Sequence, residues 1–127
     1  MLNERKKILM VEDDIFLRKI YRDKLTRAGF DFVEATNGQE GLNKVMAEAP
    51  DLVFLDLILP KKNGFDVLVE IKRNKATQNI PVVILSNLGQ ESDIKRGMDL
   101  GAKDYLIKAD VSLSEVVQKA KEWLIKK

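Results

Sequence analysis

The chain has 127 residues, of which 45% are hydrophobic and 33% charged, and this composition is typical of a single globular domain spanning residues 1–127. Its 22 basic and 20 acidic residues leave a net charge of +2, and this near balance gives no support for direct binding to nucleic acid. The chain contains neither histidine nor cysteine, which excludes a Ser–His–Asp triad, a phosphohistidine carrier, thiol nucleophiles, and histidine or thiolate metal sites.

The N-terminal segment MLNERKK lacks the apolar core of a signal peptide. No later segment approaches the run of about 18 apolar residues that crosses a membrane. From these two observations we expect a cytoplasmic protein without membrane insertion.

Five short apolar runs predict five β-strands. They are KILMVE (7–12), FVEA (32–35), LVFLD (52–56), VVILS (82–86) and YLIK (105–108). Three of them are continuously apolar, which indicates strands that are covered on both faces of a parallel sheet. The run at 32–35 alternates instead, as a half-exposed edge strand does.

Each run is followed by a segment whose apolar residues recur with the period of an α-helix. Four of these stripes are formed by Leu17, Ile20, Leu25 and Ala28, by Leu42, Val45, Met46 and Ala49, by Phe65, Leu68 and Ile71, and by Val116, Val117, Ala120, Trp123 and Leu124. The segment near 90–100 has the weakest pattern and carries Gly97 in its interior.

Residues suited to capping helices mark three of the expected helix starts. Asp14 precedes the first helix, and Asn37 the second. Ser112, with Glu115 three residues later, forms a capping box before the fifth.

Strict alternation of strands and helices predicts the α/β class, with a single doubly wound, five-stranded parallel sheet and five helices. In such sheets, ligands bind beyond the carboxyl ends of the strands, where the strand order reverses. The residues at these ends are therefore the candidates for a functional site.

Ionic and polar residues follow four of the five runs. Glu12 and Asp13 follow the first, Asp56 ends the third, Ser86 the fourth and Lys108 the fifth. Asp56 lies between four apolar residues and three more, and a lone charge there is unfavourable unless it is paired or coordinated. Each residue alone could be a cap, a turn residue or a solvated strand end. Because one fold rule brings all of them to the same crevice, we expect a shared site.

The chemistry of these residues is that of metal-assisted phosphoryl transfer. Glu12, Asp13 and Asp56 offer the hard oxygen ligands that Mg²⁺ prefers, and the metal would offset their mutual repulsion. A carboxylate can attack a phosphoryl group to form an aspartyl phosphate. Lys108 could supply a cation, and Ser86 a hydrogen bond, to the phosphoryl oxygens.

Four segments, ILMVEDD, PDLVFLDLILPKKNGFDVL, IPVVILSN and GAKDYLIKAD, resemble the response-regulator receiver domain of two-component signalling. The resemblance covers essentially the whole chain. It implies a flavodoxin-like fold with strand order 2-1-3-4-5. It also implies the following functional residues: the phosphoacceptor Asp56, the metal ligands Glu12, Asp13 and the main-chain carbonyl of Ile58, the switch residues Ser86 and Tyr105, and the phosphate-binding Lys108.

By the same resemblance, Asp56 would take its phosphoryl group from a histidine kinase or a histidine phosphotransfer protein, with Mg²⁺. A downstream protein would read the signal on the fourth helix, fifth strand and fifth helix. The chain would not be an enzyme beyond its own phosphorylation and slow autodephosphorylation.

Two positions depart from the family pattern. The residue after Lys108 is usually proline, often after a cis peptide bond, but here it is Ala109. The residue after the switch hydroxyl is usually small, but here it is Asn87, which would either crowd the phosphoryl group or hydrogen-bond it.

Two further features concern the path of water to Asp56. Ile58 and Leu88 stand at positions that border this path in the family, and both are bulky and apolar. They predict a long-lived phosphoryl group, or alternatively an apolar contact for a partner.

Two other functions remain open. Phosphatases with an aspartate nucleophile usually have a second acid two residues after it, where this chain has Ile58. A receiver that only scaffolds, and is never phosphorylated, is disfavoured by the complete set of acids, hydroxyl and lysine.

Overall fold

The computed structural model describes residues 5–124, so both ends of the predicted domain, 1–4 and 125–127, lie outside the described residues. Its elements are β1 (Lys7–Val11), α1 (Ile15–Arg27), β2 (Asp31–Ala35), α2 (Gly38–Glu48), β3 (Leu52–Leu55), α3 (Gly64–Arg73), β4 (Val82–Ser86), α4 (Glu91–Asp99), β5 (Asp104–Ile107) and α5 (Leu113–Leu124). This strict alternation confirms the predicted α/β class.

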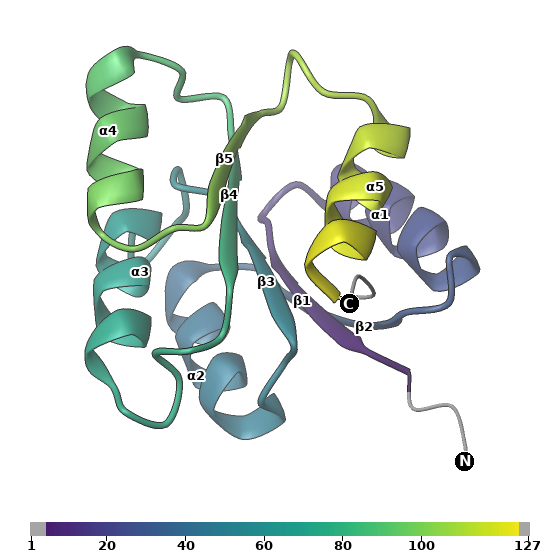
Figure 1. Cartoon of the computed structure of the whole chain (residues 1–127), viewed down its shortest axis with the longest axis horizontal. Coiled ribbons are helices and arrows are strands. Elements are labelled where there is room, and N and C mark those ends of the chain that lie inside the picture. The colour runs from purple at the N-terminus through teal and green to yellow at the C-terminus, as the bar shows by residue number, and fades with distance from the viewer. Residues whose placement is uncertain (1–4, 125–127) are drawn as a thin grey trace.

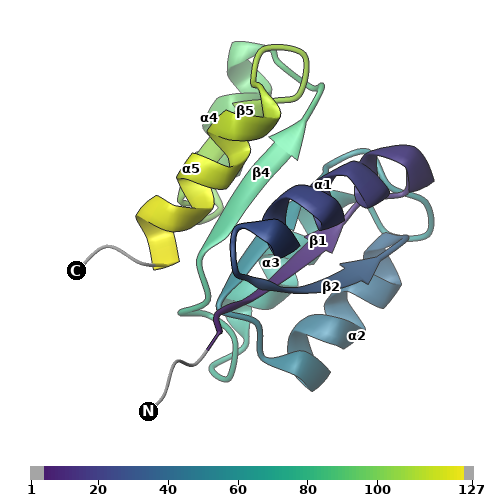
Figure 2. The same cartoon turned by 90° about the vertical axis from the view of Figure 1, so that its right-hand side faces the viewer.

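The five strands form one parallel sheet in the order β2-β1-β3-β4-β5, as the resemblance implied. Helices α1 and α5 cover one face, while α2, α3 and α4 cover the other (Figures 1 and 2). β1, β3 and β5 end one residue earlier than predicted, so Glu12, Asp56 and Lys108 lie just beyond the strands. The carboxyl ends of the strands thus bring these side chains to one edge of the sheet.

Two hydrophobic cores lie on the two faces of the sheet. Successive residues of β1 alternate between them: Ile8 and Met10 pack with α1 and α5, and Leu9 and Val11 with α2 and α3. All four are at most 1% exposed, so the continuous apolar runs reflect burial on both faces. β2, by contrast, is only partly buried and lies at the edge, as its alternating sequence predicted.

The inward face of α1 differs from the predicted stripe. Ile20 is 42% exposed, and Arg18 and Tyr21 are buried with Leu25 instead. Residues three and four apart share a helix face, so 18, 21 and 25 form one stripe that excludes 20. Three other predicted stripe residues are also exposed: Met46 at 50%, Trp123 at 39%, and Ala49.

The predicted caps are confirmed. The Asp14 carboxylate accepts hydrogen bonds from the second and third amides of its helix, at 2.9 and 3.2 Å. Asn37 caps α2 in the same way at 2.8 Å. In the capping box of α5, the Ser112 amide donates to Glu115 at 2.7 Å, and the Glu115 amide donates to the Ser112 hydroxyl at 3.1 Å.

Gly97, which weakened the sequence pattern of α4, has a packing role. A Cβ atom at this position would lie 2.5 Å from Cδ1 of Ile84 and 3.3 Å from the ring of Tyr105. The glycine therefore lets α4 lie close against β4 and β5.

Candidate functional site

Three carboxylates converge at the carboxyl edge of the sheet. Each of Glu12, Asp13 and Asp56 offers an oxygen within 4.8 Å of those on the other two. Glu12 and Asp56 are only 2% and 5% exposed, whereas Asp13 is exposed. The amide of Glu12 donates to the carbonyl of Ala35, and that of Asp56 to the carbonyl of Val11. The two buried acids are thus held by backbone bonds that extend the sheet past its strands.

Lys108 joins the two buried acids. Its Nζ lies 2.5 Å from Oε1 of Glu12 and 2.7 Å from Oδ2 of Asp56. The other oxygen of Asp56, Oδ1, accepts a hydrogen bond from the Ile58 amide at 3.2 Å. Both oxygens of Asp56 are therefore oriented by neighbours.

The electrostatics of the cluster follow from burial and pairing. Burial raises the pKa of Glu12, although the hydrogen bond from Lys108 opposes this shift. Burial lowers the pKa of Lys108, but its hydrogen bonds to Asp56 and Glu12 and their charges outweigh burial, so the net pKa is raised. The lysine accordingly stays charged at neutral pH.

The acid cluster fits a divalent cation. When all groups are ionised, three carboxylates against one ammonium group leave a formal charge of −2. Mg²⁺ binds a few carboxylates and keeps several waters, and the exposed Asp13 leaves the cluster open to solvent on one side. Glu12, Asp13 and Asp56 are the residues that would hold it. The predicted contribution of the Ile58 carbonyl stays a prediction.

The cluster forms the floor of an open cleft of about 310 Å³. Its lining residues are Glu12, Asp13, Asp14, Leu17, Asp56, Ile58, Asn87 and Lys108. Ile58, 57% exposed, borders the cleft as predicted. The corresponding expectation for Leu88 is wrong, because its side chain packs against the hydrophobic core beneath α2, α3 and α4.

The two predicted switch residues meet at the backbone of Leu88. Ser86 is fully buried, and its Oγ accepts a hydrogen bond from the Leu88 amide at 3.3 Å. The hydroxyl of Tyr105 donates to the Leu88 carbonyl at 2.5 Å. Ser86 does not line the cleft, although it lies at the same end of the sheet.

The sequence reasoning missed two groups at the site. Arg18, 8% exposed, donates from Nη1 to the Glu12 carbonyl at 2.9 Å and from Nε to Glu34 at 3.2 Å. Its place on the helix stripe with Tyr21 and Leu25 is the signal that could have revealed it. It fixes the main chain that carries the acidic pair.

The second missed feature joins the two departures from the family pattern. Oδ1 of Asn87 accepts a hydrogen bond from the Ala109 amide at 3.1 Å. The peptide bond between Lys108 and Ala109 is trans, like all others in the described residues.

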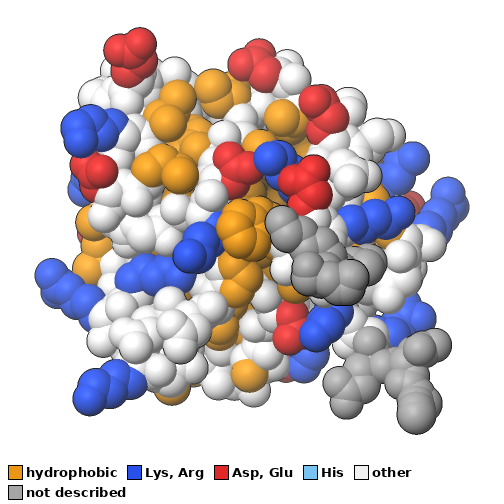
Figure 3. All heavy atoms as spheres, in the orientation of Figure 1, with side chains coloured by type: hydrophobic (Ala, Val, Ile, Leu, Met, Phe, Trp, Pro, Cys, Tyr) orange, Lys and Arg blue, Asp and Glu red, His pale blue; other side chains and the backbone are white. Residues whose placement is uncertain are grey.

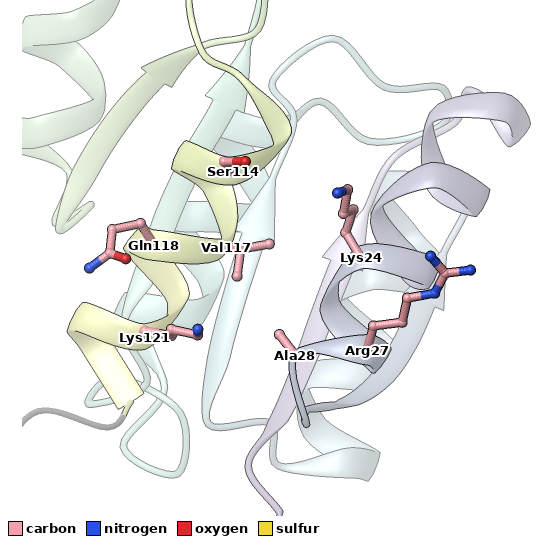
Figure 4. Close-up of a pocket in the computed structure, with 7 residues that line it drawn as sticks. All are labelled: Lys24, Arg27, Ala28, Ser114, Val117, Gln118 and Lys121. Carbon is pink, nitrogen blue, oxygen red and sulfur yellow. The ribbon is translucent and has the colours of Figure 1, made fainter.

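A second groove, of about 370 Å³, lies between α1 and α5 and does not share this chemistry. Figure 4 shows its lining residues on the two helices: Lys24, Arg27 and Ala28 on the α1 side, and Ser114, Val117, Gln118 and Lys121 on α5. None of these side chains is a carboxylate. The cleft over Asp56 is therefore the candidate site.

Comparison with known proteins agrees with this geometry. Residues 8–121 match the response regulator receiver domain. The chain belongs to this family. This receiver is 36% identical to the chemotaxis protein CheY of Thermotoga maritima over 81% of its own length and 85% of that protein. It is 37% identical to the probable transcriptional regulator ycf27 of Guillardia theta over 84% of its own length.

The receiver spans only 41% of that regulator, less than half its length. Among solved structures, the Mn²⁺-bound form of response regulator Rcp1 superposes with a TM-score of 0.86 at 29% identity, covering 96% of each chain. The family and the fold predicted from the sequence are thus confirmed. Within residues 5–124, no helix is both long and apolar enough to span a membrane.

Proposed function

We propose that this receiver is a cytoplasmic phosphorelay component that accepts a phosphoryl group on Asp56, with Mg²⁺, from a histidine kinase or a histidine phosphotransfer protein. The observation that carries the proposal is the placement of Asp56: a carboxylate, 5% exposed, bonded to a charged lysine and grouped with two further acids in an open cleft. This is the set of groups that phosphoryl transfer to a carboxylate needs.

The transfer itself is a displacement at phosphorus. An oxygen of Asp56 forms the new P–O bond while the P–N bond of the donor breaks, and the leaving imidazole nitrogen keeps the bonding electrons. The ammonium group of Lys108 lies 2.7 Å from Asp56. As the carboxylate becomes an acyl phosphate, this group pairs with a phosphoryl oxygen instead. Mg²⁺, when bound by the acids, supplies a second cation for these oxygens.

The chain's own residues favour a receiver over a phosphatase. Ile58 occupies the place two residues after Asp56, so a substrate's leaving group would find no second acid there to protonate it. We therefore propose that the chain catalyses only its own phosphorylation and slow autodephosphorylation.

The signal is proposed to pass from Asp56 to a protein partner through Ser86 and Tyr105. Movement of the Ser86 hydroxyl toward the phosphoryl group would break its bond to the Leu88 amide, and Tyr105 is bonded to the same residue. Tyr105 lies on β5, between α4 and α5. Figure 3 shows hydrophobic side chains gathered over β5 and toward α4, with charged side chains around them. We propose this surface of α4, β5 and α5 as the partner's docking face, with no direct contact to nucleic acid.

Intact-mass spectrometry after exposure to acetyl phosphate tests the function. A stable gain of one phosphoryl group that requires Mg²⁺ and is lost in Asp56→Asn is the expected result. Consumption of acetyl phosphate without a stable gain would favour the phosphatase. Neither gain nor consumption would favour the scaffold.

A further inference from the structure

Asn87 and Ala109 form a hydrogen bond between two loops of the cleft. Asn87 follows β4 and Ala109 follows Lys108, and the bond from the Ala109 amide to Oδ1 of Asn87 measures 3.1 Å. A proline at position 109 would have no N–H to donate. The two departures from the family pattern are therefore two halves of one contact.

This bond fixes which way the Asn87 amide faces. An N–H needs an acceptor, so the side-chain oxygen must point to Ala109 and the nitrogen, Nδ2, must point elsewhere. Asn87 lines the same cleft as Asp56 and Lys108. Within residues 5–124, the bond from the Ala109 amide is the one hydrogen bond of this side chain, which leaves both hydrogens of Nδ2 available.

We propose that Nδ2 of Asn87 donates a hydrogen bond to the oxyanion held at Asp56, which is a phosphoryl oxygen in the signalling state. Lys108 is the one cation among the cleft's lining side chains, and Asn87 is their one neutral amide donor. Asn87 thus adds a contact that neither lysine nor metal supplies, and the Ala109 amide orients it. The inference rests on the proposed function, because it requires an anion at Asp56.

The first experiment measures the affinity for beryllofluoride, a phosphoryl mimic, by NMR titration in the presence of Mg²⁺. Hydrogen bonds to charged groups are among the stronger ones, so we expect Asn87→Ala to bind at least about tenfold more weakly than the wild type. Asn43→Ala, which removes an exposed asparagine on α2, is the matched control and should bind as the wild type does. Equal affinity of Asn87→Ala and wild type would overturn the inference.

Two further variants separate the donor from the loop contact. Asn87→Asp keeps the acceptor for Ala109 but removes the donor, so it should retain protection of the Ala109 amide from hydrogen exchange and still bind the mimic weakly. In Asn87→Ala, the Ala109 amide should exchange about tenfold faster or more. Tight binding by Asn87→Asp would contradict the donor role.

Ala109→Pro removes the N–H, and Ala109→Gly retains it. We expect weaker binding from the proline variant only, and no further loss when Asn87→Ala is added to it. Full additivity of the two changes would contradict the proposed orientation. Failure of the wild type itself to bind beryllofluoride would instead overturn the proposed function, while the exchange of the Ala109 amide, measured without ligand, would still report on the loop contact.

Discussion

Removal of the Asp13 carboxylate should stabilise the chain when Mg²⁺ is absent. An oxygen of Asp13 lies within 4.8 Å of oxygens on Glu12 and Asp56. Two unit charges at that distance repel by about 3.5 kcal/mol at an effective dielectric constant of 20. Asp13 is exposed, and Lys108 offsets part of the repulsion, so we expect Asp13→Asn to raise the free energy of unfolding by about 1 kcal/mol in chelator.

The same substitution should remove the stabilisation by Mg²⁺. A ligand at 100 times its dissociation constant stabilises the folded state by about 2.7 kcal/mol, and Asp13 is one of three carboxylates available to the metal. Urea unfolding followed by circular dichroism, in chelator and in saturating Mg²⁺, measures both effects. Asp23→Asn, an exposed acid on α1 outside the cleft, is the control. Loss of stability in chelator, or equal stabilisation of Asp13→Asn and wild type by Mg²⁺, would refute the reasoning.

Three other outcomes follow from particular contacts. Gly97→Ala should lower the free energy of unfolding by about 1–3 kcal/mol despite alanine's helix propensity, because its Cβ would lie 2.5 Å from Ile84, and unchanged stability in urea would contradict this. Ile58→Asn, at a 57% exposed position, should leave the free energy of unfolding within about 0.5 kcal/mol of wild type but speed loss of the phosphoryl group by about tenfold. An unchanged lifetime of the phosphorylated protein, followed by intact mass, would show that Ile58 does not exclude water. Hydrogen bonds from the Thr36 amide and hydroxyl lower the pKa of Glu40 from its usual 4.5. The ionised carboxylate therefore stabilises the fold above pH 4.5, and this stabilisation is lost as the pH falls through the lowered pKa. Glu40→Gln should therefore lower the melting temperature at neutral pH and match the wild type in acid, whereas a difference that persists in acid would contradict the shift.

Much of the fold and the acid cluster could be predicted because each depends on local patterns. The continuous apolar runs of β1, β3 and β4 reflect burial on both faces, and the alternating run of β2 reflects its place at the edge. Because parallel strands direct their carboxyl ends to one edge of the sheet, the sequence then predicted that Glu12, Asp56 and Lys108 lie close together.

The remaining contacts depend on pairs distant in sequence. Arg18 can be buried on α1 because Glu34 and the Glu12 carbonyl accept its hydrogen bonds. The apolar pattern does not reveal these partners, so it predicted the wrong buried face of the helix, with Ile20 inward. Asn87 and Ala109 are 22 residues apart, and neither residue type alone indicates a partner.

The sequence also did not predict which way a single side chain points just after a strand. Leu88 could face the cleft or the core, and burial of its apolar surface against the core decides.

Chemical trapping tests the assignment of Asp56 as phosphoacceptor most directly. Borohydride reduces an aspartyl phosphate to homoserine, and peptide mass mapping then locates the modified residue. After treatment with acetyl phosphate and Mg²⁺, we predict homoserine at position 56 alone, and none when a chelator replaces the metal. Homoserine at Asp13 or another acid, or an equal yield at position 56 in chelator, would contradict the proposed Mg²⁺-dependent phosphorylation of Asp56.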